Sequence, residues 1–490
     1  MYNSIQHFME LGVKNIEKII KDFINGENND ISNLVIGLQK PLQELQCSII
    51  SETIESLDDE LRKSSKRKGK WLIDRNDDLN SFMATCGEIK YKRTYFKSKE
   101  TGERKYLADH LVGIKPHMRI SNDVVCNVIE NAIDTSYRAS GNLATYTDDK
   151  VSKQSVMKQI HEVEIPIKLK ERESKKKVRV LYIDADEDHV SLQFKNKKGD
   201  LKKDEYGRKN NTIMPRLVYV YEGIRKVSPS SKRNELYGKH YFGGVYSNSE
   251  TLWDEVSEYI DSKYDADYLE KIYISGDGAS WIKKGLDILG AKSHFILDKF
   301  HLNKYINQAT SHLEDTVETS REAIYDSFSF EDKKDCKRIF EDILAVTDIK
   351  TKRKAVLRSR DYIMNQWDGI IIVNKDSDAK IGCSAEGHIS HILSDRLSSR
   401  PLGWSILGVD KMSRLRVYKA NGGKIYDLVM YKKEKEKLKI EAEILKNYNK
   451  KIKEKRIKYN DVFNTEFSIY EAGKKNGLYK SLKSLRGICG

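Results

Sequence analysis

Between residues 178 and 297 the sequence alternates short apolar runs with amphipathic stretches, in an order that few folds accommodate. Apolar runs typical of strands lie at Val178–Ile183, Arg216–Tyr221, His240–Tyr246, Ile272–Ser275 and His294–Leu297. Helical spacing of apolar residues separates the last three runs, first around Leu252, Val256 and Ile260 and then from Trp281 to Leu289. The pattern therefore predicts three strands, a helix, a strand, a helix and a fifth strand.

This order of elements is typical of the ribonuclease-H-like fold, an α/β core in which helices flank a mixed five-stranded sheet. In that layout the first and fourth strands end side by side, so residues that follow them share one edge of the sheet. We expect this core to comprise residues 175–301 and 381–430. The helical and charged pattern between these ranges predicts a helical insertion over residues 302–380.

The two ends of the chain have helical patterns of their own. Apolar residues recur at helical spacing through the first 65 residues, and we expect a helical N-terminal region over residues 1–85 that serves for packing or dimerisation. Residues 431–490 are basic and begin with an extremely charged stretch. Such a stretch predicts a solvated helical C-terminal region, although contact with a polyanion is also open.

A basic β-hairpin is predicted over residues 86–110. Its first part alternates in polarity, Thr101-Gly102 supplies a turn, and Tyr91 and Tyr95 are expected on one face. A hairpin of this kind is either a structural element that is basic by composition or a surface that follows a phosphate backbone. In the second case Lys92 and Arg93 would make the contacts.

A helix-turn-helix-like region is predicted over residues 111–170. A helical stripe of apolar residues is followed by a short segment with Gly141 and then by a second helix, for which Ser152 is the expected N-cap. Three-helix units without a nucleic-acid role are common, but a helix of this kind can also enter the major groove of DNA. Its exposed side chains would be Lys153, Gln154 and Lys158.

The charge balance favours a polyanionic partner. The 490 residues include 88 Lys and Arg against 74 Asp and Glu, which gives a formal net charge of +14. Solubility alone is the alternative explanation. The abundance of Lys, Asn, Ile and Tyr also matches the codon bias of an AT-rich bacterial genome, so part of the lysine excess is neutral.

Cysteine usage and hydropathy favour a cytosolic protein. The six cysteines lie far apart, at Cys47, Cys86, Cys126, Cys336, Cys383 and Cys489. They form no CxxC pair, which fits a reducing compartment. Acidic residues interrupt the apolar N-terminus, so it is unlike a signal peptide, and no apolar run approaches the ~20 residues that cross a bilayer. We expect a cytoplasmic bacterial protein associated with the nucleoid.

Three acidic positions carry the strongest chemical signal. The stretch from Asp184 to Asp188 places carboxylates at the end of an apolar strand, where burying them without partners is costly. Asp277 follows another strand between two glycines, which permit a tight turn and the close approach of a ligand. Glu386 is expected in the first turn of a helix that begins near Cys383. We expect the three to converge and to carry metal-dependent chemistry.

Each of these signals has an ordinary explanation when it is taken alone. A DxD pattern arises by chance in a chain this rich in acids, and Gly-Asp-Gly is commonly only a turn. A glutamate in the first turn of a helix is ordinary complementation of the helix dipole. Their order on the predicted strands and helices is the more specific feature.

The longer motifs resemble those of a known family. YIDADEDHVSLQ, ISGDGASWIKKG, FILDKFHLNKYI and CSAEGHISHILSDRLSSRPLGWS are similar to the motif series of ISLre-type insertion-sequence transposases, which are related to Mutator-like transposases. The likeness covers nearly the whole chain. It implies a catalytic triad of Asp186, Asp277 and Glu386, with Asp184 as an alternative or additional first acid. His301, in the Asp298-to-His301 motif, would hold DNA or order the site.

The resemblance also implies a cofactor and partners. The carboxylates would hold two Mg²⁺ ions, for which Mn²⁺ can substitute, because hard divalent cations prefer oxygen ligands. Double-stranded DNA would be the substrate, as the terminal inverted repeats of an element and as target DNA. The chain would act on DNA as a homo-oligomer, at least a dimer, since two ends must be held together.

The helix after Glu386 carries further polar residues. We expect Arg396 and Arg400 to meet phosphates. His388 and His391, with Asp395, have the spacing of zinc ligands on one helical face. Because no cluster of Cys or His completes such a site, structural zinc is the weaker interpretation. Two rival functions remain open: a ribonuclease-H-like nuclease or resolvase that cuts without joining, and a non-catalytic DNA-binding protein from a decayed element.

Overall fold

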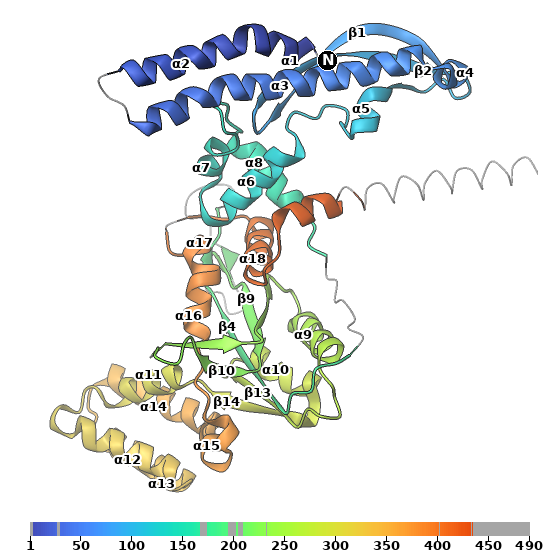
Figure 1. Cartoon of the computed structure of the whole chain (residues 1–490). Coiled ribbons are helices and arrows are strands. Elements are labelled where there is room, and N and C mark those ends of the chain that lie inside the picture. Colours follow the sequence, from blue (N-terminus) through green and yellow to red (C-terminus); the bar gives the residue numbers. More distant parts are fainter. Residues whose placement is uncertain are drawn as a thin grey trace, which may run out of the picture. The chain divides into compact units, whose positions relative to one another are not determined.

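The computed structural model describes residues 3–26, 30–166, 174–194, 202–203, 209–231, 233–400, 402–432 and 434 (Figure 1). The chain divides into two compact units, residues 1–429 and 430–490. The predicted helical C-terminal region, residues 431–490, lies almost entirely outside the described residues.

A mixed five-stranded sheet forms the centre of the first unit, as the sequence predicts. Its strands are β4 (Val180–Glu187), β9 (Arg216–Tyr221), β12 (His240–Gly244), β13 (Lys271–Gly276) and β14 (Ser293–Leu297). They are arranged in the order β12-β9-β4-β13-β14. The first three strands pair antiparallel, whereas β13 is parallel to both β4 and β14. β4 therefore lies in the middle of the sheet.

Helices cover both faces of this sheet (Figure 1). On one face α9 (Ser249–Lys263) and α10 (Ser280–Leu289) bury Trp253 and Ile282 against Leu181 and Ile183 of β4. On the other face the chain after the insertion forms α16 (Ala385–Ile389), the π-helix η5 (Ser390–Ser394), α17 (Asp395–Leu397) and α18 (Ile406–Ala420). Ile389 and Met412 of these helices pack in one cluster with Tyr219 and Tyr241. Because successive side chains along a strand point to opposite faces of the sheet, each strand contributes residues to both cores.

The segment between β14 and α16 is helical, as predicted. It contains α11 (Lys299–Thr310), η3 (Glu314–Thr316), α12 (Val317–Ser329), α13 (Lys333–Ala345), α14 (Lys350–Asn365), α15 (Trp367–Lys375) and η4 (Ser377–Lys380). These helices share a core around Phe340 and Ile363, and Leu297 of β14 joins it. The insertion therefore packs as one body against the end of the sheet.

The N-terminal region departs from the expectation in one respect. Residues up to Lys70 are helical, in α1 (Asn3–His7), η1 (Phe8–Gly12), α2 (Val13–Asn25), α3 (Ile31–Lys63) and α4 (Ser65–Lys70). Residues 71–84, however, form the strand β1 (Trp71–Ala84), so the expectation of helix throughout 1–85 was wrong there. β1 is rich in Asp and Asn, which disfavour strands, and its pairing with β2 (Gly87–Ser98) over nearly its whole length decides the conformation.

The predicted hairpin is present, and its two tyrosines have different partners. β2 pairs with β3 (Arg104–Tyr106) around the predicted turn. Tyr91 is buried, and its hydroxyl donates to Asp109 at 2.7 Å. Tyr95 instead packs on Tyr106, with ring centroids 4.6 Å apart. Arg93, between them in β2, pairs with Asp109 and lies over the Tyr106 ring at 3.6 Å, so both tyrosines contact one connected group, as expected for residues on one face.

The helix-turn-helix-like region contains the two predicted helices, α6 (Asn122–Asp134) and α8 (Lys153–Glu162), and two short helices that the sequence did not predict, α5 (Leu107–Val112) and α7 (Tyr137–Asn142). The side chain of Ser152 caps α8 by accepting from the Ser155 amide, as expected. α6 and α8 share the core that also contains α18.

The remaining described elements are short. They are β5 (Val190–Ser191), β6 (Lys202–Lys203), β7 (Lys209–Asn210), β8 (Thr212–Ile213), β10 (Gly223–Lys226), β11 (Asn234–Tyr237) and the 3₁₀ helix η2 (Gly290–Lys292). In the part of the chain that is described, no helix has the length and apolar character needed to span a membrane.

Candidate functional site

Asp186 and Asp277 stand at the ends of two neighbouring parallel strands. In the pairing of β4 with β13, Ser275 lies opposite Asp184. The same register, continued by two residues, sets Asp277 opposite Asp186 at the carboxyl edge of the sheet. Both residues are partly buried. Two acids that lie far apart in the sequence therefore meet because the strands that carry them are adjacent.

Glu386 follows the insertion in the sequence and lies near this pair. It lies in the first turn of α16 and is exposed. Burial is the main cause that raises the pKa of Asp186 to about 6, and the negative charges of Asp277 and Glu386 add to the rise. The Glu187 amide and the His301 imidazole oppose it. Asp186, Asp277, Glu386 and His301 are thus close enough to act on one another electrostatically.

Asp184 has a structural position, unlike Asp186. Its side chain is fully buried and accepts from the Tyr219 hydroxyl at 2.6 Å, the Tyr221 hydroxyl at 3.3 Å and the Ser384 amide at 3.0 Å. Burial raises the pKa of Asp184 to about 6, and these hydrogen bonds oppose the rise. The carboxylate therefore ties β4 and β9 to the segment that leads into α16, which makes metal coordination by Asp184 a poor fit.

The third aspartate of the motif is also bound to protein. Asp188 is 8% exposed, and the Ser398 hydroxyl donates to it at 2.9 Å. Of the aspartates at 184, 186 and 188, only Asp186 thus has a carboxylate without a side-chain hydrogen-bond donor in the described residues. This distinction supports Asp186 as the first acid of the site.

Asp298 and His301 form a pair next to the carboxylates. Asp298 follows β14 and caps α11 by accepting from the Phe300 amide. The Nδ1 atom of His301 lies 3.0 Å from Asp298 Oδ2. This contact is the main cause that raises the pKa of His301, and the charges of Asp277 and Asp186 contribute. The acidic edge of the sheet therefore favours the protonated form of His301.

The insertion holds the turn that carries Asp277. The Tyr362 hydroxyl of α14 donates to the Asp277 carbonyl at 2.6 Å, and the Tyr362 ring stacks on Tyr305 of α11 at 3.8 Å between centroids. Gly278 has a φ of +83°, and a Cβ there would meet the Gln366 side chain at 2.5 Å. Sequence reasoning missed both Tyr362 and Gln366, because nothing in a helical pattern far from the motif indicates which residue reaches back to it.

The segment before Glu386 is tied to the sheet at two places. At its start, Lys271 and the Tyr273 hydroxyl donate to Asp376, and Arg179 donates to both oxygens of Asp378. At its end, Ser384 is held by Asp184. We call residues 376–384 the strap. Lys271 is the main cause that lowers the pKa of Asp376 to about 2.

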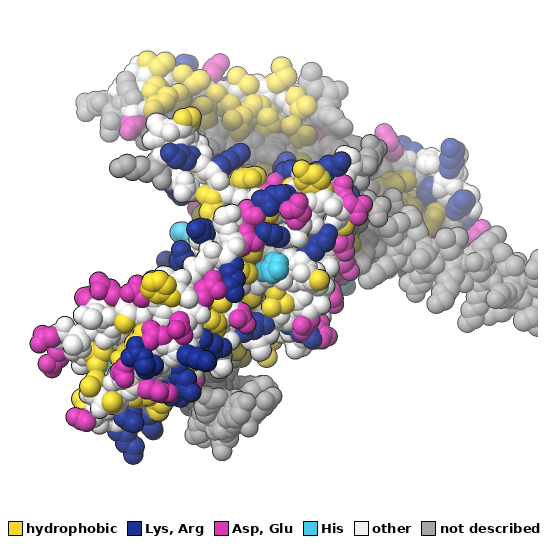
Figure 2. Space-filling view, turned by 90° about the horizontal axis from the view of Figure 1, so that it is seen from below, with side chains coloured by type: hydrophobic (Ala, Val, Ile, Leu, Met, Phe, Trp, Pro, Cys, Tyr) yellow, Lys and Arg dark blue, Asp and Glu magenta, His cyan; other side chains and the backbone are white. Residues whose placement is uncertain are grey.

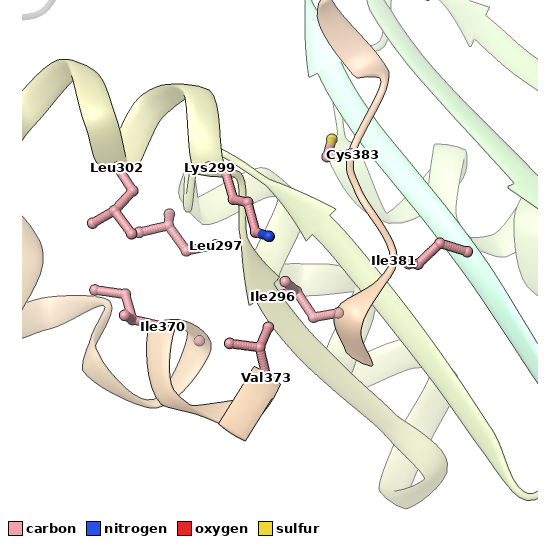
Figure 3. Close-up of a pocket in the computed structure, with 9 residues that line it drawn as sticks. Ile296, Leu297, Lys299, Leu302, Ile370, Val373, Ile381 and Cys383 are labelled. Carbon is pink, nitrogen blue, oxygen red and sulfur yellow. The ribbon is translucent and has the colours of Figure 1, made fainter. Parts of the chain in front are cut away.

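A small cavity of about 50 Å³ lies beside the strap (Figure 3). Ile381 and Cys383 of the strap line it together with Leu302 of α11 and Ile370 of α15. Figure 3 shows the amino group of Lys299 pointing toward it. Burial and the nearby carboxylates raise the pKa of Cys383 well above its usual range. Ligand pockets usually enclose ~300–1,000 Å³, so this cavity is a packing gap and no substrate site.

Apart from His301, the predicted DNA-contacting residues fall into two groups. Five are exposed: Lys92, Lys153, Gln154, Lys158 and Arg400. Arg93 instead pairs with Asp109 and stacks on Tyr106 at 3.6 Å. Arg396 is 7% exposed, donates to the Ala132 carbonyl and lies 4.8 Å from the Trp404 ring. Both guanidinium groups are used inside the protein, which corrects the expectation that they meet phosphates.

A basic cavity opens beside the hairpin, although the sequence did not indicate it. It has a volume of about 420 Å³ and is lined by Lys90, Arg93, His117 and Arg119, with Leu79 and Met118. The lining combines β1, β2 and the loop after α5. The cavity and the exposed Lys92 both belong to the hairpin sheet.

The zinc interpretation finds no support. His388 packs between Tyr219 and Tyr241, whose hydroxyl lies 3.0 Å from His388 Nδ1, and burial lowers the His388 pKa to about 4. The π-helix η5 begins at Ser390 and breaks the regular spacing to His391. His388 is therefore part of the core.

The three carboxylates have the chemistry that a hard divalent cation requires, but their present positions do not form a binding site. Asp186, Asp277 and Glu386 offer oxygen donors, and their charges oppose one another, which a cation would relieve. Within the described ranges, no three side chains among His, Cys, Asp and Glu are close enough as they stand to hold an ion. Ion binding would therefore require these side chains to close by rotation.

Comparison with known proteins identifies the family. The chain matches an uncharacterised protein family, UPF0236, over residues 25–435. The chain belongs to this family. A UPF0236 protein of Caldanaerobacter subterraneus subsp. tengcongensis is 37% identical over 476 residues, which cover 96% of this chain and 95% of the relative. A second from the same organism is 37% identical over 467 residues, covering 94% and 92%, and its name joins eleven locus designations.

The matching solved structures include a transposase complex. It is the Drosophila P element transposase strand transfer complex, with 10% sequence identity to this UPF0236 chain. The match covers 66% of this chain and 84% of that one, at a TM-score of 0.23. A likeness this slight carries no argument about fold or function.

Proposed function

We propose that this UPF0236 protein is the DNA transposase of an insertion sequence, with a ribonuclease-H-like catalytic core. It would bind the ends of the element, hydrolyse phosphodiester bonds there and transfer the freed 3′-hydroxyl to target DNA. The single observation that carries the proposal is the meeting of Asp186 and Asp277 at adjacent strand ends, with Glu386 near enough to raise the pKa of Asp186.

The sheet supports the ribonuclease-H-like assignment. Three antiparallel strands are followed by a helix, a parallel strand, a second helix and a fifth parallel strand. The acids stand at the carboxyl ends of the first and fourth strands, where α/β sheets generally place their sites. The third acid follows an insertion on a helix that covers the sheet.

Asp186, Asp277 and Glu386 would hold two Mg²⁺ ions, with Mn²⁺ as a substitute. Such ions lower the pKa of an attacking water and stabilise the charge on the leaving oxygen. The protein's own contribution is to position these acids. Tyr362 fixes the backbone of Asp277, and Asp184 fixes the segment just before Glu386. The His301 imidazole, paired with Asp298, would face the phosphate or balance the carboxylates.

Double-stranded DNA is the proposed substrate for three reasons. The net charge of +14 favours a polyanion. Lys153, Gln154 and Lys158 are exposed on α8, which is the position of a groove-reading helix. The name of one relative joins eleven locus designations of one organism, and repetition within a genome is what an insertion sequence produces.

A strand-transfer assay tests the proposal. The purified chain is incubated with Mg²⁺ or Mn²⁺, a supercoiled target and a labelled duplex that ends in the inverted repeat flanking the gene, pre-cut to expose its 3′-hydroxyl. Joining of label to target is expected for the wild type and for Asp395→Asn, an exposed acid of α17 that serves as control. It should be lost in Asp186→Asn, Asp277→Asn and Glu386→Gln, with thermal unfolding unchanged.

The two rival functions give different results in the same assay. A nuclease or resolvase would cut an uncut end in a metal-dependent way but join nothing. A non-catalytic DNA-binding protein would shift the duplex on a gel without cutting it under any metal. Retained joining in any of the three triad variants would contradict the proposed site.

A further inference from the structure

The first two long helices present a broad apolar surface that nothing in the described structure covers. Besides Leu11, seven aliphatic side chains from Met9 to Leu42 are between 38% and 63% exposed: Met9, Val13, Ile20, Ile24, Ile31, Val35 and Leu42. We call these seven residues the apolar seam. Figure 2 shows hydrophobic side chains gathered along these helices at the upper left of the view.

The spacing of the apolar seam is that of helices built to pack against other helices. On α3, Ile31, Val35, Leu38, Leu42, Leu45 and Ile49 follow one another at alternating intervals of four and three residues. On η1 and α2, Met9, Val13, Ile16 and Ile20 do the same. This heptad pattern keeps one stripe of each helix facing a helical neighbour.

The two stripes lie on the same side of the pair. α2 and α3 pack through a different face, where a Cβ on Gly37 would touch Ile19 at 3.0 Å. In each helix the apolar stripe is turned in the same sense, by about a quarter turn, from this contact face. Because the helices run antiparallel, both stripes then point to one side and form a single continuous surface.

The size of this surface suits an interface. At roughly 100 Å² for each half-exposed aliphatic side chain, the seam offers about 700 Å² per chain. A standard interface buries about 800 Å² per partner, and monomeric proteins seldom expose more than a few hundred Å² of contiguous apolar surface. A two-helix surface of this size is half of a four-helix bundle.

The charges beside the seam distinguish among possible partners. The first 50 residues carry four lysines against six acids, although the whole chain is strongly basic. This balance disfavours DNA, and it also disfavours a membrane surface, since helices that lie on membranes carry lysine and arginine on their polar face. Mixed charges allow two copies to approach without repulsion. A symmetric pair would also match like surface to like surface.

We propose that the apolar seam is the self-association surface of this protein, where α2 and α3 of one copy pack on α2 and α3 of a second. The association is independent of catalysis and of metal. It therefore goes beyond the proposed transposase function and stands or falls separately from it.

Sedimentation equilibrium of the full chain, without DNA or metal, tests the proposal. The seam variant is Ile20→Glu/Val35→Glu. The matched control is Asn15→Glu/Lys40→Gln, which makes the same change in net charge at exposed positions on the opposite faces of α2 and α3. A second variant, Ile20→Leu/Val35→Leu, keeps the seam apolar. Circular dichroism verifies that all four proteins are helical to the same extent.

The expected result is a dimer for the wild type, the control and the leucine variant. The seam variant should have a dimer Kd raised by at least roughly 100-fold, because each buried carboxylate enters a symmetric interface twice. A monomeric wild type at ~100 μM, far above the Kd expected for an interface of this size, would overturn the proposal and assign the seam to another segment of the same chain. A seam variant that dimerises as well as the control would overturn it too.

Discussion

Replacing Asp184 tests whether its carboxylate positions the strap, in contrast to the carboxylate of Asp186, which is proposed to take part in catalysis. The Oδ2 atom of Asp184 accepts from the Tyr219 hydroxyl and the Ser384 amide, and its Oδ1 atom accepts from the Tyr221 hydroxyl. In Asp184→Ala, Tyr219 keeps Ser384 Oγ at 2.8 Å, but the Ser384 amide and the Tyr221 hydroxyl lose their acceptor. Each stranded buried donor costs about 1–3 kcal/mol, so the change should cost about 2–6 kcal/mol.

Asp184→Asn should behave differently although it removes the same charge. The amide oxygen can take the place of Oδ2 and keep both Tyr219 and Ser384. The amide nitrogen then faces the Tyr221 hydroxyl, which can accept as well as donate. The buried charge also disappears, so the cost should stay below about 1 kcal/mol.

Hydrogen exchange at the Ser384 amide measures this difference directly. A loss of about 2 kcal/mol corresponds to roughly 30-fold faster exchange, and larger losses to more. We expect at least this acceleration in Asp184→Ala, little change in Asp184→Asn and none in Asp186→Asn, whose carboxylate does not contact Ser384. Unchanged exchange in Asp184→Ala would refute the assignment of Asp184 as the residue that holds the strap.

Three further changes test the surroundings of the site. Tyr362→Phe removes the hydrogen bond to the Asp277 carbonyl and should lower the joining rate by roughly 2- to 12-fold, the equivalent of about 0.5–1.5 kcal/mol, with wild-type rates contradicting the role. Gly278→Ala forces a side chain into a positive φ against Gln366 and should cost about 1–3 kcal/mol, seen as a lower melting temperature. The Asp376 pKa is lowered to about 2, so its stabilisation is present above pH ~4 and is lost as pH falls toward 2. The melting temperatures of wild type and Asp376→Asn should therefore differ at pH 6 and converge toward pH 2, and a constant difference would contradict this.

The sequence predicts the central sheet well because its strands are apolar runs bounded by acids or glycines. In β4 and β13 the run stops where the carboxylate begins, so Asp186 and Asp277 could be assigned to strand ends before the pairing was known. Parallel pairing then requires that they be neighbours. β1 was missed because its polar residues carry no strand pattern, and only its partner β2 fixes it.

Side-chain partners were harder to predict than strands. Arg93 and Arg396 were assigned to DNA because they are basic, yet Asp109 and the Ala132 carbonyl engage them inside the fold. Asp184 stayed an alternative to Asp186, because the pattern of its own strand does not reveal that two tyrosines of the neighbouring strand bind it. Such partners depend on tertiary register, which a single sequence does not contain.

Strand β4 carries Asp186 and also holds the strap through Asp184, and Arg179, the residue just before β4, holds the strap at Asp378. Because this one central strand carries Asp186 and holds the segment that leads to Glu386, it fixes the distance between these two acids. The helices of the insertion are tied to the same edge of the sheet, because Tyr362 of α14 holds the Asp277 carbonyl and α15 runs directly into the strap. A displacement of these helices by a large ligand would therefore be passed on to Asp277 and to the strap.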